Sequence, residues 1–152
     1  MFFYYAKEIR ALNKNKIRYL VVGGFAVNLH GVQRLTLDLD LMLDLTKEHL
    51  EKVIEVLGKL RYRTKVPRKL WEKASSIAFT HQKDEDQLID IFLKNPIDFD
   101  EAYARRKTFV IDGLNIDCVS LDDLLELKNK ADRVRDWLDI GALKRYKQLE
   151  KE

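Results

Sequence analysis

The sequence predicts an α/β (α+β) fold, in which helices flank a mixed β-sheet and C-terminal helices pack on it. At 152 residues the chain has the usual length of one domain, and its apolar share of 46% is typical of globular proteins. Helical and strand patterns follow the order helix, strand, helix, strand, helix, two strand pairs and helices, which differs from a regular βαβ repeat. We expect a single domain over 1–152, with a core over about 17–119 and a helical segment over about 120–149.

Hydrophobic spacing and glycine positions predict five elements in the first 60 residues. Apolar residues three or four apart indicate a helix, whereas alternation or a short run of β-formers indicates a strand. A glycine directly after a helical pattern marks its end, and a threonine before one is a typical N-cap. The predicted elements are a helix over 2–13 with Tyr5, Ile9 and Leu12 on one face, a strand over 17–22 that ends at Gly23-Gly24, a short helix over 25–30 that stops at Gly31, an alternating strand over 37–43, and a helix over 46–60 capped by Thr46.

The second half of the sequence predicts strand pairs and then helices. A polar turn at 83–86 separates two apolar strands, and Asp112-Gly113 favours a two-residue hairpin turn. Ser120 is a typical N-cap for the last helical region, in which we expect a break near Asp132–Arg133. The predicted elements are strands over 77–80 and 88–93, a short helix over 98–106, strands over 108–111 and 115–119, and helices from 120 to about 149.

Composition and charge exclude several classes of protein. The chain has 28 Lys and Arg against 25 Asp and Glu, and its net charge of +3 is too small to indicate a nucleic-acid binder by itself. The single cysteine, Cys118, excludes a disulfide framework and a cysteine-rich zinc site. The longest apolar stretch, near 19–27, is far shorter than the roughly 18 residues of a membrane span, and the first residues lack the layout of a signal peptide. We therefore expect a soluble, cytoplasmic protein.

Two aspartates alternate with leucines in the predicted strand over 37–43. Asp38 and Asp40 share one face of that strand, with β-carbons about 7 Å apart. Like charges so placed repel each other unless a cation lies between them, and Mg²⁺ prefers carboxylate oxygens and leaves positions open for phosphate. The pattern therefore predicts a metal platform, although a half-exposed strand with a polar face gives the same alternation.

The Gly23-Gly24 turn favours the metal hypothesis. A strand that ends in two glycines and runs into a helix lets the backbone approach a ligand, and the free N–H groups of the helix N-terminus suit phosphate oxygens. Taken alone, the same turn is compatible with a plain strand-to-helix connection. The sequence contains neither a Gly-x-Gly-x-x-Gly motif nor a Walker motif, so it predicts neither a Rossmann dinucleotide site nor a P-loop.

A third acid is needed to hold a second metal ion or to accept the proton of an attacking hydroxyl. Asp90 is the first candidate because it is a single acid in the apolar segment 88–92, and Asp117 ranks below it. Without the other motifs, Asp90 is equally compatible with an edge strand whose acid faces water.

These motifs resemble those of a known family. Gly23-Gly24, Gly31 and Arg34-x-Thr36-x-Asp38-x-Asp40 are similar to the motif of nucleotidyltransferases of the DNA polymerase β superfamily, and more narrowly to its AbiEii-like branch, which includes toxins of type IV toxin–antitoxin systems. The C-terminal segment is similar to a helical motif of that branch, with the pattern Leu121-x-x-Leu124-x-x-Leu127-Lys128-x-x-Ala131-x-Arg133-x-x-Asp136-x-x-Asp139-Ile140-x-x-Leu143.

The resemblance implies a nucleotidyltransferase-like fold. It also implies an enzyme that transfers a nucleoside monophosphate from an NTP to an acceptor, with Mg²⁺ (or Mn²⁺) as cofactor. By position, Gly23 and Gly24 would meet the β- and γ-phosphates. The catalytic and metal-binding acids would be Asp38, Asp40 and Asp90. Many members have Ser where this chain has Gly24, which removes one phosphate contact but keeps the backbone cradle.

Two basic residues, Arg34 and Lys128, have two possible roles each. Arg34 and Thr36 precede the aspartate strand, where they would touch triphosphate oxygens, but Arg34 is equally able to pair with Asp38 or Asp40. Lys128 lies within an apolar helical stripe, so it either extends to solvent or is held by an acid or a phosphate. Arg133 and Asp136 are helix neighbours that are expected to pair. The basic cluster Arg61, Arg63, Lys65, Arg68 and Lys69 is either a solvated surface or a track for a nucleic-acid backbone.

The resemblance leaves the acceptor and the partners open. The acceptor would be an RNA 3′ end such as that of tRNA, a protein hydroxyl or a small molecule, and a cognate antitoxin or toxin protein is a further expected partner. The longer toxins have an additional helical region that this chain mostly lacks. The alternative function is a catalytically inactive module of a toxin–antitoxin pair, which binds a nucleotide or a partner and transfers nothing.

Overall fold

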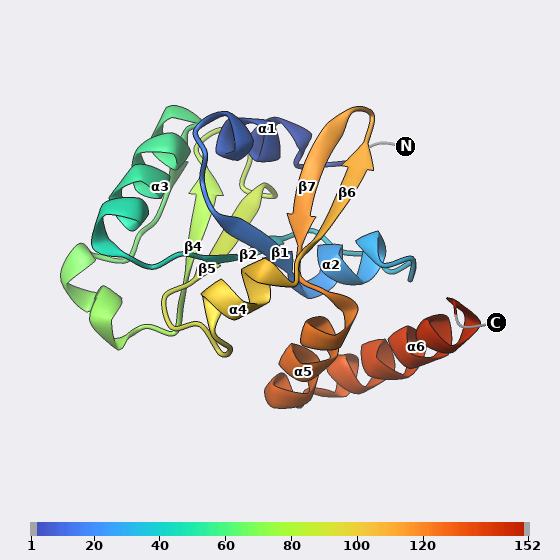
Figure 1. Ribbon diagram of the computed structural model, residues 1–152. Helices are drawn as coiled ribbons and strands as arrows, with labels where there is room; N and C mark the ends of the chain where they lie inside the picture. Colours follow the sequence, from blue (N-terminus) through green and yellow to red (C-terminus); the bar gives the residue numbers. More distant parts are fainter. Residues whose placement is uncertain (1–2, 151–152) are drawn as a thin grey trace.

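The computed structural model describes residues 3–150, which form one seven-stranded sheet surrounded by helices (Figure 1). The elements are α1 (Ala6–Lys14), β1 (Tyr19–Val22), α2 (Gly23–Leu29), β2 (Leu39–Leu43), α3 (Lys47–Lys59), β3 (Tyr62–Arg63), the 3₁₀ helix η1 (Arg68–Lys73), β4 (Ser76–His81), β5 (Leu88–Phe92), α4 (Phe99–Ala104), β6 (Lys107–Ile111), β7 (Leu114–Cys118), α5 (Leu121–Ala131) and α6 (Val134–Glu150). None of the helices within 3–150 is long and apolar enough to span a membrane.

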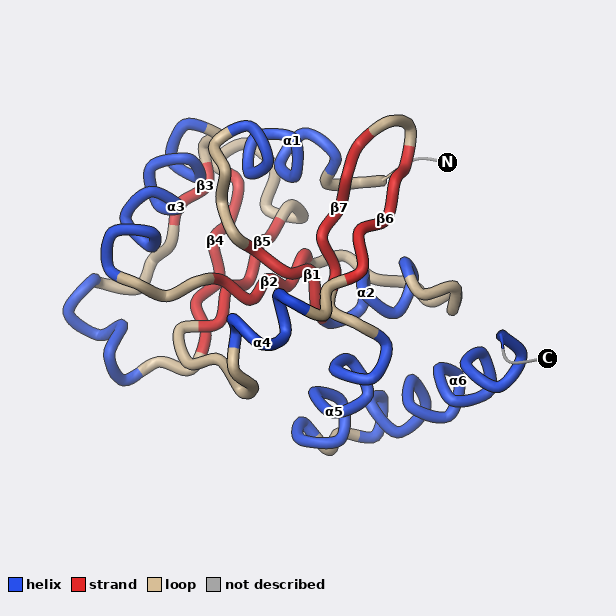
Figure 2. The backbone as a smooth tube through the Cα atoms, in the orientation of Figure 1, coloured by secondary structure: helices blue, strands red, loops and turns tan. Residues whose placement is uncertain are grey.

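The sheet is mixed, with the strand order β3-β4-β5-β2-β1-β7-β6 (Figure 2). β2 runs antiparallel to β1 and parallel to β5, and β1 runs parallel to β7. The pairs β4–β5 and β6–β7 are antiparallel hairpins. The predicted mixed sheet and both predicted hairpins are therefore confirmed. α5 packs against α2, and α6 packs beside α5 at the lower edge of the molecule in Figure 1.

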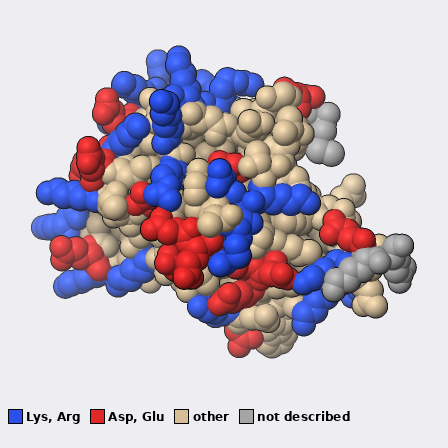
Figure 3. Space-filling view, in the orientation of Figure 1, with Lys and Arg blue, Asp and Glu red and all other residues tan. Residues whose placement is uncertain are grey.

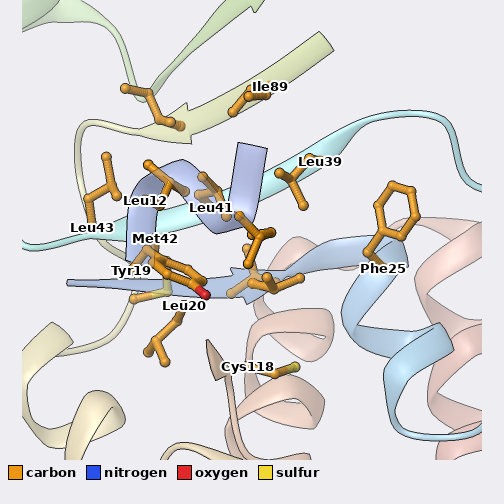
Figure 4. Close-up of a cluster of buried hydrophobic side chains, with 14 of the residues drawn as sticks. Leu12, Tyr19, Leu20, Phe25, Leu39, Leu41, Met42, Leu43, Ile89 and Cys118 are labelled. Atoms are coloured by element: carbon orange, nitrogen blue, oxygen red, sulfur yellow. The ribbon is translucent and has the colours of Figure 1, made fainter. Parts of the chain in front are cut away.

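The hydrophobic core lies around the two central strands (Figure 4). All four residues of β1 are buried, and β2 buries Leu39, Leu41, Met42 and Leu43. A strand that is apolar on both faces requires cover on both faces. Asp40 is the one polar residue of β2, and it lies near the end where the strand begins. The core therefore holds β1 and β2 rigidly up to the point where the acidic residues lie.

The segment before β2 differs from the prediction. The strand begins at Leu39 instead of residue 37, and the side chain of Leu37 is 61% exposed. The carbonyl oxygen of Leu37 accepts a hydrogen bond from the Tyr5 hydroxyl, so it does not take part in a ladder with a neighbouring strand. The residues from Gly31 to Asp38 are an irregular loop, and Asp38 lies at its end rather than inside a strand.

Several smaller predictions can be compared with the structure. The break between the last two helices is confirmed, because Asp132 has a φ of 50°. Ser120 caps α5 as predicted, whereas the Thr46 side chain makes no capping hydrogen bond to α3. β3 and η1 were not predicted, since a strand of two residues and one 3₁₀ helix leave no periodic pattern. Residue 2 of the predicted first helix lies outside the described residues, and α1 begins at Ala6.

Candidate active site

One pocket of about 580 Å³ brings together the eight preferred site residues predicted from the sequence. It lies where β1 ends and β2 begins, beside β5, and its walls are the loop after α2, α5 and the start of α6. The predicted residues that line it are Gly23, Gly24, Arg34, Thr36, Asp38, Asp40, Asp90 and Lys128. Segments more than 100 residues apart in the chain thus meet at one cavity, while the roles of these residues stay predictions.

Asp40 and Asp90 stand side by side on the parallel strands β2 and β5. Their Cα positions are partners in register, so both carboxylates lie on the same face of the sheet. Burial raises the pKa of Asp40 to about 7, and the negative charges of Asp90 and Asp38 add to this effect. Burial and the negative charge of Asp38 also raise the pKa of Asp90, while a hydrogen bond with Ser76 partly counteracts this rise. The floor of the pocket therefore carries negative charge that no neighbouring cation within 3–150 fully offsets.

Two glycines leave the floor open at the start of α2. Gly23 has a φ of 66°, and a Cβ there would lie 2.1 Å from Asp40 Oδ2. A Cβ at Gly24 would lie 2.4 Å from Thr36 Oγ1. Neither position has room for a side chain. The Thr36 hydroxyl fills the space that a serine at position 24 would need, which gives a physical reason for the departure from the family pattern.

The cations of the pocket are held by two carboxylates of α6. Lys128 is buried, and its Nζ lies 3.2 Å from Asp136 Oδ1 and 3.0 Å from Asp139 Oδ2. Arg34 also pairs with Asp139, so the alternative role considered for Arg34, pairing with Asp38 or Asp40, is wrong. The predicted Arg133–Asp136 pair is confirmed by an Nε–Oδ2 distance of 2.7 Å. Lys128 does not extend to solvent: it is held by acids while it lines the pocket.

Burial alone would raise the pKa of Asp136, but hydrogen bonds from Arg133 and Lys128 outweigh it and lower the pKa. Although Asp136 is fully buried, these hydrogen bonds keep it ionised as the partner of both cations at neutral pH. The α6 carboxylates keep Lys128 in place, and through Asp139 they also fix Arg34.

Further pocket residues were not predicted as ligand-binding. Ser76 and Phe92 line the pocket from β4 and β5, and Arg133 and Arg135 line it from the junction of α5 and α6. Ser and Phe at such positions do not indicate a ligand-binding role. Arg135 is one of many exposed basic residues in a chain with 28 Lys and Arg residues in total. Only the fold brings these groups to the cavity.

Two candidates from the sequence lie elsewhere. Asp117 accepts a hydrogen bond of 2.6 Å from Thr108 Oγ1, has Arg106 at 3.6 Å, and lines a different pocket. The basic cluster over 61–69 is exposed outside the predicted site, and the aromatic residues within and beside it, Tyr62 and Trp71, are buried and thus not free to stack on bases. Acidic and basic side chains are interspersed over the face shown in Figure 3, as on an ordinary solvated surface.

The donor chemistry of the pocket floor suits a divalent cation. Carboxylate oxygens are the ligands that Mg²⁺ and Mn²⁺ prefer, and the raised pKa of Asp40 reflects its burial together with the negative charges of Asp90 and Asp38, which such an ion would offset. Gly23 keeps the space beside Asp40 free of any side chain. As the side chains stand, no three His, Cys, Asp or Glu residues within 3–150 are grouped closely enough to hold an ion. Coordination would therefore require these carboxylates to turn toward one another.

Comparisons with known proteins identify the fold. No protein-family model matches the sequence, and no curated protein matches it. The lincosamide antibiotic adenylyltransferase LnuA, in its lincomycin-bound form, matches with a TM-score of 0.65 and 22% identity over 91% of this chain and 92% of that chain. ANT(2″)-Ia, in complex with adenylyl-2″-tobramycin, matches with a TM-score of 0.63 and 17% identity over 94% of this chain and 87% of that chain.

A third solved structure differs from these two in size. The Megavirus polyadenylate synthase matches with a TM-score of 0.55 and 16% identity over 94% of this chain, but over 32% of its own length. Proteins described by different transferase activities thus share this architecture, and at such identities the likeness concerns the fold alone. The chain has the nucleotidyltransferase fold.

Proposed function

We propose that the chain is a nucleotidyltransferase that transfers a nucleoside monophosphate from an NTP, bound with Mg²⁺ or Mn²⁺, to an acceptor. One observation carries the proposal: a bare glycine turn, three carboxylates and four basic side chains line a single pocket in a protein of this fold. A half-exposed strand or a plain strand-to-helix turn would give no reason for this convergence.

The triphosphate would lie against the start of α2. Gly23 and Gly24 leave the backbone accessible there, and the N-terminus of a helix favours phosphate oxygens. Thr36, Arg34 and Lys128 supply the other phosphate-binding groups. Arg34 and Lys128 are already tied to α6, so nucleotide binding would need little further ordering of either side chain.

Asp38, Asp40 and Asp90 would hold the metal, which, when bound, neutralises charge on the phosphate oxygens. The acceptor oxygen forms a bond to the α-phosphorus, the bond from the α-phosphorus to the bridging oxygen breaks, and pyrophosphate leaves. Asp90 accepts the proton of the acceptor or serves as a ligand of a second ion. Its raised pKa makes it a better proton acceptor than an exposed aspartate. Positioning and charge neutralisation would supply most of the rate enhancement.

Membership of the AbiEii-like branch is part of the proposal. Its support is that the two segments of the motif meet in space, because Arg34 from the first pairs with Asp139 from the second. The acceptor classes are an RNA 3′ end, a protein hydroxyl and a small molecule, and a cognate toxin or antitoxin protein is the proposed partner.

The test uses each α-labelled NTP with Mg²⁺ or Mn²⁺ and three acceptor pools: tRNA, lysate protein and small-molecule hydroxyl compounds. The wild-type chain should label one pool, and Asp40→Asn should lower the rate by about 100-fold or more. Asp117→Asn is the matched control, since this aspartate lies in a different pocket. Equal labelling by an Asp38→Asn/Asp40→Asn double variant would refute the proposal. NTP binding without transfer to any pool would support the inactive binding module instead.

A further inference from the structure

Tyr5 does not line the pocket, but it contacts a residue that does, Leu37. Its side chain is fully buried at the N-terminus of α1. The ring packs edge-on against Phe25 of α2, with centroids 5.4 Å apart. Its hydroxyl therefore reaches the interior from a segment whose sequence pattern predicts only packing.

The hydroxyl of Tyr5 joins the strand that carries Asp90 to the loop that carries Asp38. It donates a hydrogen bond of 2.6 Å to the carbonyl oxygen of Leu37 and accepts one of 3.0 Å from the amide of Leu88. The carbonyl oxygen of Leu88 lies 3.1 Å away as a second acceptor. One buried side chain thus bridges backbone groups 51 residues apart in the chain.

This bridge lies where the parallel pairing of β2 and β5 ends. β2 and β5 are paired in parallel from Leu39 and Ile89 onward. One step earlier, a continued parallel ladder would join the Leu88 amide directly to the Leu37 carbonyl. Both groups bond the phenol oxygen instead, so a hydroxyl stands where the next rung would be. The ladder ends there, and the two chains separate just before the acids.

The separation determines where the acids lie. Asp38 follows Leu37 directly and is exposed at the end of the loop, whereas Asp40 and Asp90 remain paired in the sheet. A direct rung would continue the strand through Asp38 and fix it in the ladder opposite Leu88. With the hydroxyl inserted, Asp38 stands apart from the paired acids, and its charge still acts on both of them.

We propose that Tyr5 is a positioning residue of the active site. Its hydroxyl sets the separation between the Asp38 loop and the Asp90 strand, and thereby the spacing of the carboxylates that receive a divalent ion. The inference rests on the proposed function. Burial raises the pKa of Tyr5 to about 12, so the hydroxyl keeps its proton at neutral pH.

The test compares Tyr5→Phe with a matched control, Tyr19→Phe. Tyr19 is also fully buried, and its hydroxyl also bridges, donating to Asn13 Oδ1 at 2.8 Å and accepting from the Asp117 amide at 3.2 Å, but it lies away from the pocket. Each variant loses one bridging hydroxyl and keeps its ring. Two quantities are measured: the dissociation constant for Mn²⁺ alone, from the electron paramagnetic resonance signal of the free ion, and kcat and KM for the NTP.

Tyr5→Phe should weaken Mn²⁺ binding by roughly 10-fold to 100-fold and lower kcat by a similar factor, as is typical when a group that orients metal ligands is removed. The KM for the NTP should change less than about threefold, because the phosphate-binding groups are untouched. Tyr19→Phe should leave both quantities unchanged. If Tyr5→Phe does not fold, p-aminophenylalanine at position 5 keeps a donor at the same place and should retain Mn²⁺ binding.

Equal losses in both variants, or none in either, would overturn the inference, since a purely structural hydroxyl gives one of these results. Retained activity in Tyr5→Phe beside an active wild-type chain would overturn the positioning role alone. A wild-type chain that neither transfers a nucleotide nor binds Mn²⁺ would remove the proposed function, and this inference with it.

Discussion

Asp40→Asn should stabilise the metal-free protein at neutral pH. In the folded chain, burial and the charges of Asp90 and Asp38 raise the pKa of Asp40 from the usual 3.8 to about 7. Between these values the folded state keeps a proton that the unfolded state has released, so the free energy of unfolding falls as the pH rises. Below about pH 4 both states are protonated, and this contribution disappears.

The structure also sets the size of the effect. At about 1.4 kcal/mol per pKa unit, a rise from 3.8 to about 7 destabilises the folded state by at most about 4 kcal/mol above neutral pH. Asp40 is partly exposed, so solvent screening reduces this figure, and we expect about 1–2 kcal/mol from the asparagine variant. For a chain of this length, that corresponds to a rise in Tm of about 2–8 °C.

The assay is thermal unfolding followed by circular dichroism, with a chelator present, near pH 8 and near pH 4. The variant should unfold at a higher temperature than the wild type at the higher pH, and the difference should vanish at the lower one. Asp117→Asn should show no such gain, because Thr108 and Arg106 already partner that carboxylate. An asparagine variant less stable than the wild type near pH 8 without metal would refute the argument from the raised pKa of Asp40.

Three further variants test the turn and the cation wall. Gly23→Ala should destabilise the fold by about 1–3 kcal/mol in urea unfolding, since its Cβ would lie 2.1 Å from Asp40 Oδ2 at a φ of 66°; unchanged stability would contradict the close approach. Gly24→Ser should likewise unfold more easily, because its Cβ would lie 2.4 Å from the Thr36 hydroxyl, and adding Thr36→Ala should recover part of the lost stability, since it removes that hydroxyl but keeps the Thr36 Cβ, 2.9 Å from the new Cβ. Lys128→Met should cost about 1–3 kcal/mol, because Asp136 and Asp139 lose a buried partner and keep only Arg133 and Arg34, and a loss below about 1 kcal/mol would show that the Lys128 pairs are effectively solvated.

Local sequence patterns predicted most of the fold, because the type of most helices, strands and turns depends on residues close together in the sequence. The apolar run before Gly23 predicts β1, and Asp112-Gly113 predicts the β6–β7 hairpin, which has positive φ at both turn residues. The start of β2 was missed by two residues, since the alternation continues through Leu37 while the backbone there is held by Tyr5. A distant hydroxyl overrode a local pattern, and no local pattern contains that information.

The candidate site also combines features that neighbouring residues encode with contacts that only the folded chain creates. Glycines and alternating aspartates mark the floor of the pocket, because backbone clearance and a shared strand face depend on neighbours in sequence. The sequence did not indicate the carboxylate that pairs with Arg34, since Asp139 lies 105 residues away and reaches it only after α6 folds back. Arg135 was not considered as a pocket residue for the same reason. The acids of the site can therefore be predicted from the sequence, whereas ion pairs between residues far apart in the chain cannot.

The distribution of charge around the pocket supports the ligand that we propose for it. The floor has three carboxylates that no basic side chain of residues 3–150 meets at hydrogen-bond distance, so it favours a cation. On the helical wall, three cations (Lys128, Arg34 and Arg133) share two carboxylates of α6, which leaves an excess of positive charge. A ligand that satisfies both surfaces must present positive charge to the sheet and negative charge to the helices. A triphosphate with a divalent ion on its sheet-facing side has this arrangement, whereas a simple anion or a polycation would satisfy one surface and be repelled by the other.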